Sequence, residues 1–270
     1  MKSTMKQHKL STIQLDDLPT EVLLNVLNFL ELPDINNFGQ VSKRLKSASL
    51  VDSLWQEIIL INKTMSNNLV EKALDRGCKT LCLKSCRLTE ASHLLSTFDK
   101  SRIKEGKNHV SSQLINLDLY NCEFTHGFLE TLLLSSHSLK TFSLTDYNIN
   151  RFPNSVLRMF YIQNGQTLQT LNLAFTRVVS FEHIELIVKH CTGLKEVDFS
   201  DCCLSSLSVN FLVEGITKNI EKFGLAYCGL GRSAIDHYIN ILVSICNKIK
   251  SLNIALNSIT DETLTSIMEI

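Results

Sequence analysis

A short motif that recurs seven times in residues 81–270 is the feature that most constrains how this 270-residue chain folds. Residues 81–88 and 117–124 share the pattern L-x-L-x-x-C followed by one variable and one apolar residue. The same frame starts again at residues 142, 171, 197, 223 and 252, so successive starts are 36, 25, 29, 26, 26 and 29 residues apart. Apart from the first gap, these spacings fit a structural repeat of about 20 to 29 residues.

Helical patterns separate the frames. Apolar residues recur three and four positions apart in residues 127–137, 181–191 and 233–246. A short strand followed by a helix cannot bury both apolar faces alone, so each unit has to stack on its neighbours. The predicted fold class is therefore α/β, with residues 81–270 forming a solenoid of about seven strand and helix units that curves into a horseshoe.

The chain has nine cysteines, an odd number that does not suggest a disulfide framework. A small side chain that tolerates burial and bonds to loop backbone groups suits the point where the chain leaves each strand. Four cysteines occupy that point, five residues after a frame start, and the other frames place a tyrosine, a threonine and an asparagine there: Cys86, Cys122, Cys202, Cys228, Tyr147, Thr176 and Asn257. We interpret these cysteines as reduced framework residues.

Two chemical roles for the cysteines compete with this interpretation. Cys78, Cys82 and Cys86 are spaced by four, which is not the spacing of a zinc knuckle, so we expect no metal site and no cofactor. A thiol enzyme that uses Cys82 or Cys203 as nucleophile stays open as an alternative, although the sequence names no partner base. We expect no catalytic residue in this chain.

Charge and hydropathy exclude other classes of protein. The 27 Lys and Arg residues balance the 27 Asp and Glu residues, so we expect no nucleic-acid partner. No apolar stretch reaches the roughly 18 residues that span a bilayer, and residues 1–15 lack the apolar segment of a signal peptide. We therefore expect no membrane partner and a location in the nucleus and cytoplasm.

Residues 13–61 lack the repeat frame and form a separate block. Pro19 suits the first turn of a helix, and a break after residue 30 restarts a second helical pattern in residues 35–45. Asp52 and Ser53 can cap a third helix, which would contain Trp55 and Ile58. Seven of the nine residues in 22–30 are apolar, more than a bundle this small can cover, so part of this stripe should meet another protein.

The block resembles an F-box on four groups of residues taken in order: Leu18-Pro19-x-Glu21, Leu30-x-Leu32-Pro33, Val41-Ser42-x-x-Leu45 and Leu54-Trp55. The frames resemble the cysteine-containing leucine-rich repeats of one group of F-box proteins. Within the F-box proteins, residues 52–57, followed by Asn62-Lys63 and Arg76-Gly77 before the repeats, are most similar to the S-phase kinase-associated group. This resemblance implies a non-catalytic substrate receptor of an SCF-type cullin-RING ubiquitin ligase. Its F-box would bind the Skp-family adaptor, and through it the cullin, while its repeats would bind a protein substrate for ubiquitination. The alternative is a non-catalytic leucine-rich-repeat scaffold or inhibitor.

The resemblance divides the chain into a disordered tail (1–12), an F-box (13–61), a linker helix (62–80) and leucine-rich repeats (81–270) with a mobile insertion near 99–112. It implies adaptor contacts on the apolar residues of the F-box, about half of which we expect in the F-box's own core: Leu18, Pro19, Leu23, Val26, Leu27, Leu30, Leu32, Pro33, Ile35 and Trp55.

Alternate strand positions should face the concave side of the repeats. The candidate substrate-binding residues are the polar and aromatic ones at these positions: Lys84, Asn116, Asp118, Tyr120, Asn172, Glu196, Asp198, Lys222 and Asn253. This face contains no arginine, so direct recognition of a phosphate group is not expected. The resemblance implies a small Cks-type accessory protein for that task.

Overall fold

The structure is a computed structural model that describes residues 14–268, except 90–111, 125–126, 148, 150–152, 178 and 217. The chain divides into two compact units, Met1–Trp55 and Gln56–Ile270, called the first and second unit below. The tail predicted at 1–12 and almost all of the insertion predicted near 99–112 lie outside the described residues.

The first unit is built from short helices. They are the 3-10 helix η1 (Leu15–Asp17), the α-helices α1 (Thr20–Leu27), α2 (Leu32–Phe38) and α3 (Lys43–Ser49), and the 3-10 helix η2 (Asp52–Trp55). The helix predicted from Pro19 is confirmed, since α1 begins directly after it. The single second helix predicted over residues 35–45 is wrong, because the Ser42 hydroxyl accepts a hydrogen bond from the Leu45 backbone N–H (3.1 Å) and starts α3.

Eight of the described apolar side chains form the core of the first unit: Leu23, Leu27, Leu32, Ile35, Leu45, Ala48, Leu54 and Trp55. Leu23 and Leu27 are four residues apart and lie on the same side of α1. The Trp55 indole N–H donates to the Ser49 carbonyl oxygen (2.8 Å), so its polar atom is satisfied inside this core.

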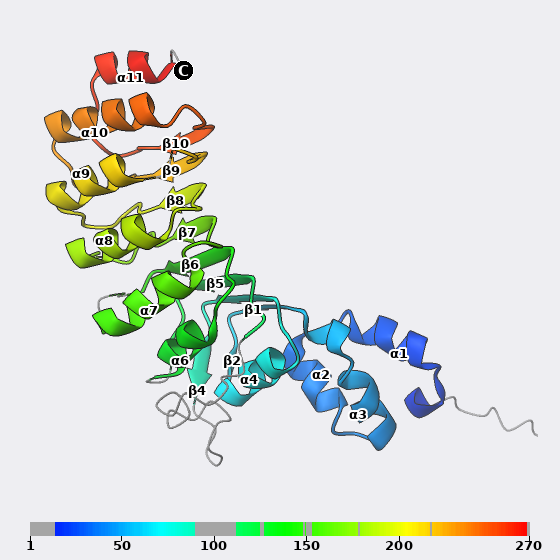
Figure 1. Cartoon of the computed structure of the whole chain (residues 1–270). Helices are drawn as coiled ribbons and strands as arrows, with labels where there is room; N and C mark the ends of the chain where they lie inside the picture. The colour runs from blue at the N-terminus through cyan, green and yellow to red at the C-terminus, as the bar shows by residue number, and fades with distance from the viewer. Residues whose placement is uncertain are drawn as a thin grey trace, which may run out of the picture. The chain divides into compact units, whose positions relative to one another are not determined.

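The second unit contains one eight-stranded sheet in which all neighbouring strands are parallel (Figure 1). The strands follow one another in the sheet in chain order, and all but β1 coincide with the seven predicted frames. Their bounds are β1 (Glu57–Ile61), β3 (Thr80–Lys84), β5 (Asn116–Tyr120), β6 (Thr141–Thr145), β7 (Thr170–Asn172), β8 (Glu196–Asp198), β9 (Lys222–Gly224) and β10 (Ser251–Asn253).

Strand β1 corrects the prediction for the end of the N-terminal block. Residues predicted to continue a third helix through Ile58 instead pair with β3, with Ile58 opposite Leu81. Ile58 and Leu60 are buried whereas Ile59 and Ile61 are exposed, which is the alternation of a strand with one covered face. Only η2 remains helical, and it ends at Trp55.

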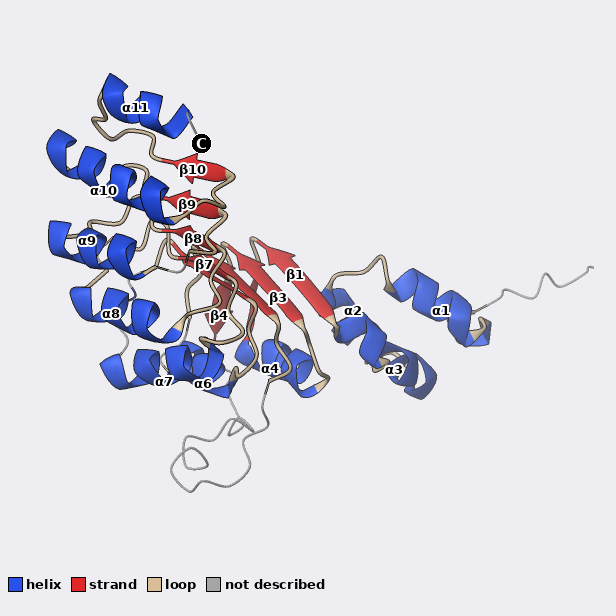
Figure 2. Cartoon of the chain, turned by 45° about the horizontal axis from the view of Figure 1, so that its top comes forward, coloured by secondary structure: helices blue, strands red, loops and turns tan. Residues whose placement is uncertain are grey.

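Helices cover one face of this sheet, and we call the opposite face the free face (Figure 2). The helices are α4 (Asn67–Asp75), α6 (Phe128–Ser135), α7 (Asn154–Asn164), α8 (Phe181–His190), α9 (Ser206–Gly215), α10 (Arg232–Ile245) and α11 (Asp261–Met268). A second, two-stranded sheet pairs β2 (Thr64–Ser66) with β4 (Arg87–Thr89). The region predicted as a linker helix therefore contains β2 and α4, and α4 buries Val70, Ala73 and Leu74.

Side chains that bond to the preceding repeat hold successive strands together. The Cys86, Cys122, Cys202 and Cys228 thiols donate to the carbonyl oxygens of Leu60, Leu83, Leu173 and Phe199, over 3.0 to 3.4 Å. Burial raises the pKa of Cys122 to about 11 and that of Cys228 to about 12, so both stay protonated as donors. The expected framework role of these cysteines is confirmed, and the architecture is compatible with a repeat solenoid.

Candidate interaction surfaces

Half of the residues predicted to contact an adaptor lie in the core of the first unit. Leu23, Leu27, Leu32, Ile35 and Trp55 are each at most 4 % exposed. Their side chains have no surface to offer a partner, because the helices of the unit already cover them. The indole of Trp55, one of these five, lies inside the unit, where its N–H is bonded to the Ser49 carbonyl oxygen.

The other five predicted residues reach the surface. Pro19 and Val26 are exposed, and Leu18, Leu30 and Pro33 are partly buried. The prediction for individual residues missed more strongly exposed neighbours: Leu15, Val22, Phe29 and Val41, of which Phe29 is 91 % and Val41 74 % exposed. The signal was present in the sequence, since Val22, Val26 and Phe29 follow the i, i+4, i+7 spacing of one helix face.

Hydrogen bonds fix the segments that carry this exposed apolar surface. The Ser42 hydroxyl donates to the Asp16 carboxylate (2.8 Å), which ties η1 to the start of α3. The Arg44 guanidinium donates to the Leu18 carbonyl oxygen, just before α1 begins. Leu15, Leu18 and Pro19 are therefore held in place by the backbone around them, as a preformed contact surface requires.

The free face of the second unit is organised in rows across the strands. Strand pairing aligns Ile59, Cys82, Asp118, Ser143, Asn172, Asp198, Gly224 and Asn253 in one row. A second row begins with Ile61, Lys84, Tyr120 and Thr145. The alternation that selected the candidate substrate-binding residues therefore holds in the structure, because these residues share the sheet face opposite the buried leucines.

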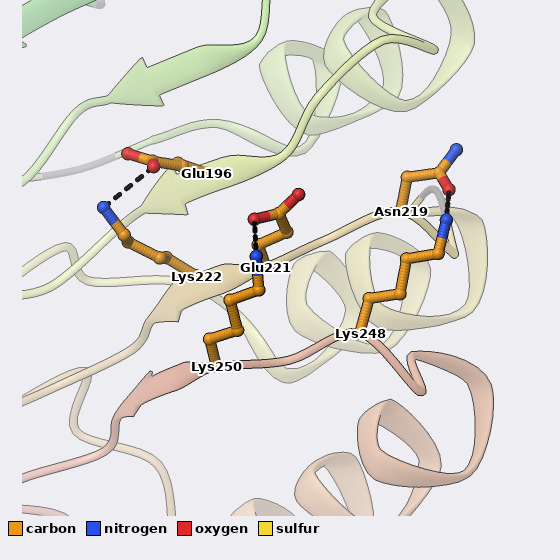
Figure 3. A network of polar contacts seen from close by, with 6 residues as sticks. All are labelled: Glu196, Asn219, Glu221, Lys222, Lys248 and Lys250. Atoms are coloured by element: carbon orange, nitrogen blue, oxygen red, sulfur yellow. Dashed lines mark hydrogen bonds and ion pairs between the residues drawn. The ribbon is translucent and has the colours of Figure 1, made fainter.

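Two of the predicted substrate-binding residues engage each other. The Lys222 ammonium lies 2.8 Å from the Glu196 carboxylate on the neighbouring strand, and this partner raises the pKa of Lys222 (Figure 3). Lys250 pairs with Glu221 (2.6 Å) and Lys248 donates to Asn219 (2.8 Å) in the same region. These contacts join successive repeats, so a substrate that used Lys222 or Glu196 would have to compete with an existing pair.

The Asp198 carboxylate is positioned by a glycine on the next strand. Its Oδ1 accepts the Ser200 backbone N–H (2.8 Å). A Cβ atom added to Gly224 would come within 2.3 Å of the same oxygen. Any other residue at position 224 would therefore clash with the Asp198 carboxylate in its present position. The Asp118 carboxylate on β5 accepts a hydrogen bond from the Cys82 thiol on β3 (3.4 Å).

The two cysteines considered as nucleophiles differ in environment. Burial and the adjacent Asp118 carboxylate raise the pKa of Cys82 to about 11, which opposes formation of a thiolate. Cys203 is exposed on the segment that follows β8. No group of three or more His, Cys, Asp and Glu side chains could hold a metal ion in the described parts of the chain. None of the described helices has the length and apolar character to cross a membrane.

Comparison with known proteins identifies one part of the chain. Residues 15–61 match the family model of the F-box-like domain. Among solved structures, the tropomodulin C-terminal domain of Caenorhabditis elegans matches with a TM-score of 0.37 at 12% identity, over 47% of this chain and 80% of that chain. The actin-binding site 2 of leiomodin-1 matches with a TM-score of 0.34 at 11% identity, over 47% and 76%. The N-terminal region is therefore F-box-like, which supports an F-box protein.

Proposed function

We propose that this chain is the substrate receptor of an SCF-type cullin-RING ubiquitin ligase. F-box domains bind Skp1-type adaptors, and F-box proteins are generally non-catalytic substrate receptors. The observation that carries the proposal is that the residues matching the F-box-like model, 15–61, carry exposed apolar side chains on α1 and on the turn after it, where Phe29 is 91 % exposed. An aromatic side chain left in water on a small unit is typical of an interface centre.

In this proposal the adaptor covers the exposed apolar residues of the first unit rather than its core. The contact residues are those that the structure leaves at the surface: Leu15, Leu18, Pro19, Val22, Val26, Phe29, Leu30, Pro33 and Val41. Burying several such side chains at about 25 cal/mol per Å² would supply the affinity, less the cost of association.

The second unit then presents the substrate. We assign it as a leucine-rich-repeat horseshoe, as in the S-phase kinase-associated group, and its free face as the substrate-binding surface. The chain performs no acyl transfer in this scheme. It raises the effective concentration of a target lysine beside the ubiquitin carrier, into the mM range for well-matched geometry. The same proposal includes a small Cks-type accessory protein for a phosphorylated substrate. It also places the protein in the nucleus and cytoplasm.

Co-purification with a Skp-type adaptor tests this function. We expect the full chain to form a stable complex, and Phe29→Asp to weaken it at least about tenfold because the substitution places a charge in an apolar contact. Met159→Asp on α7 is the matched control, since Met159 is exposed but lies in the second unit. A soluble full chain that binds no adaptor would refute the proposal and favour a non-catalytic scaffold or inhibitor.

A further inference from the structure

One residue of every repeat adopts a left-handed backbone conformation where the chain leaves the strand. Eight residues, each five positions after the first residue of its strand, have φ between 46° and 60°: Asn62, Ser85, Asn121, Asp146, Phe175, Asp201, Tyr227 and Leu256. Backbone hydrogen bonds join row residues to the residue just before the next member of the row. The Phe175 N–H donates to Ser200 O (2.9 Å), just before Asp201, and the Tyr227 N–H to Ala255 O (2.9 Å), just before Leu256. The eight side chains therefore follow one another along the same edge of the sheet.

The residue types in this row change along the chain. The first three positions carry small polar side chains, Asn62, Ser85 and Asn121, and asparagine is among the residues that tolerate this conformation. The next five alternate acidic and apolar side chains before ending on a leucine: Asp146, Phe175, Asp201, Tyr227 and Leu256. We call these five the acidic–apolar row.

Phenylalanine, tyrosine and leucine are poorly suited to this backbone. Their Cβ crowds the following carbonyl, and the same repeat uses asparagine, serine or aspartate elsewhere. They do not gain burial in exchange, because Phe175 is 50 %, Tyr227 61 % and Leu256 81 % exposed. A strained backbone that carries an exposed aromatic ring in two internal repeats points to a contact outside the chain.

The charges beside these rings indicate what that contact is made with. From β6 onward, the free-face strand positions and the left-handed row carry four carboxylates, Asp146, Glu196, Asp198 and Asp201. The one cation at these positions is Lys222, which is paired with Glu196, and Arg177 lies two residues after Phe175. With both cations counted, carboxylates exceed cations by two, and Asp146 and Asp201 alternate with the exposed apolar residues of the row.

We propose that the acidic–apolar row binds an extended segment of the substrate protein in which cationic and apolar side chains recur about every three residues. Neighbouring strands lie about 4.8 Å apart, so Phe175 and Tyr227, two strands apart, are separated by about 10 Å. An extended chain covers that distance in about three residues. The cations would meet Asp146 and Asp201, and the apolar side chains would meet Phe175, Tyr227 and Leu256. The binding step stands alone, while naming the bound protein a ubiquitination substrate rests on the proposed function.

Binding of synthetic peptides to the full chain, measured by fluorescence anisotropy, tests the chemistry. We expect (Lys-Ser-Leu)4 to bind at least about tenfold more tightly than the charge-reversed (Glu-Ser-Leu)4 and than (Lys-Ser-Ser)4, and to weaken as salt is raised. Equal affinity for the first two peptides, or no binding of (Lys-Ser-Leu)4, overturns the proposal.

A double substitution to the residue of the first repeats tests the site. Phe175→Asn with Tyr227→Asn should weaken the (Lys-Ser-Leu)4 complex at least about tenfold and keep or raise the melting temperature, because asparagine tolerates the left-handed conformation. Met159→Asn with Ile162→Asn on α7 is the matched control, since these residues are 46 % and 45 % exposed. It should change affinity less than twofold. If the first double variant melts lower and binds the peptide normally, the rings are structural and the proposal fails.

Adaptor co-purification with the same variants separates this inference from the proposed function. The Phe175 and Tyr227 variant should keep the adaptor, because both residues belong to the second unit. If the unmodified chain retains the adaptor but does not discriminate between the peptides, the inference alone is refuted. If the unmodified chain binds (Lys-Ser-Leu)4 selectively but forms no adaptor complex, the receptor function alone is refuted.

Discussion

The two units of this chain bury apolar side chains in contrasting ways. Among the described residues, eight apolar side chains form the whole core of the first unit, and each comes from a different point on the short helices. The second unit repeats one solution, in which the first and third residues of each frame are buried from Leu81 and Leu83 to Phe223 and Leu225. In the small core, few other side chains can compensate when one is removed, whereas each repeat of the second unit packs against the repeats on either side.

The same contrast applies to exposed apolar residues. In the first unit some of them lie on helices beside a minimal core, as Val22 and Val26 do on α1, and the two most exposed, Phe29 and Val41, lie in turns. In the second unit, Phe175 and Tyr227 stand at fixed positions of the repeat, where other repeats use polar residues. An exposed apolar residue in a small unit is exposed because the unit has too few residues to cover it. An exposed apolar residue in a repeat stands where other repeats of the same chain have a polar residue.

The largest effect is expected from truncating the small core. Leu27→Ala should lower the free energy of unfolding of the first unit by about 2 to 5 kcal/mol, because Leu27 is fully buried. Urea unfolding followed by Trp55 fluorescence measures it, since the chain contains one tryptophan and it lies in this unit. Val26→Ala, on the exposed side of the same helix, should cost less than about 0.5 kcal/mol. Equal costs would show that α1 packs differently.

A buried histidine should make the second unit sensitive to acid. His183 on α8 is 1 % exposed, neither ring nitrogen has a hydrogen-bond partner in the described structure, and burial lowers its pKa from 6.5 to about 4. The unfolded state therefore binds a proton more readily between these values. Stability should be complete above pH 6.5 and fall by about 3 kcal/mol as the pH drops to about 4.

Circular dichroism of urea unfolding at pH 7, 5.5 and 4.5 measures this effect. His183→Leu should flatten the pH dependence relative to the unmodified chain. The prediction is contradicted if this variant keeps the full slope. A flattened slope for His183→Leu would show that one buried group can destabilise the second unit as strongly as a core truncation destabilises the first.

A single rung of the cysteine ladder should matter less. Cys202→Ala removes the thiol that donates to the Leu173 carbonyl (3.0 Å) and should cost about 1 kcal/mol, since Thr176 still donates to the same oxygen (2.7 Å). Cys203→Ala changes the exposed neighbour and should have no measurable effect. Thermal unfolding of the two variants measures this. A loss above about 3 kcal/mol for Cys202→Ala would show that a single residue of the second unit matters as much as one in the small core of the first.

The smallest effect is expected at the surface ion pairs. Lys250→Ala removes the contact with Glu221, and we expect no measurable change in the denaturation midpoint, because Lys250 is exposed, Glu221 is only partly buried, and salt screens the pair. This prediction also has a pH component. Lys250 lowers the pKa of Glu221, so the unmodified pair should respond to acid at a slightly lower pH than the free carboxyl group of the variant. A clear midpoint shift at neutral pH would show that these pairs hold the repeats together.

The strands of the second unit could be predicted because their signal is local and repeated. Each frame places apolar residues two apart and, in every frame but the one with Tyr147, a small residue five positions after its start. This pattern suffices to locate β3 and the six strands from β5 to β10. Strand β1 could not be located in the same way. Residues 57–61 have the alternation of a strand, but they follow Asp52 and Ser53, which are typical of a helix cap. Only the pairing with β3 decides between a strand and a continued helix.

The candidate surfaces were predicted only in outline. The sequence showed that residues 22–30 carry more apolar side chains than a small unit can bury, and the structure agrees, with Val22, Val26 and Phe29 exposed. It did not show that Trp55 points inward, because a tryptophan can anchor an interface or a core equally well. Nor did it show that Lys222 and Glu196 pair, since their contact joins residues from different repeats.

The sequence by itself determined the repeat, the strand positions and the cysteine ladder, because each depends on spacing along one chain. The tertiary structure decided which side chains of the first unit remain exposed, where β1 joins the sheet, and that Phe175, Tyr227 and Leu256 share one left-handed row. These outcomes depend on contacts between residues far apart in sequence. Burial and backbone conformation at such positions are set by the neighbours that packing supplies, and no local pattern of residues records them.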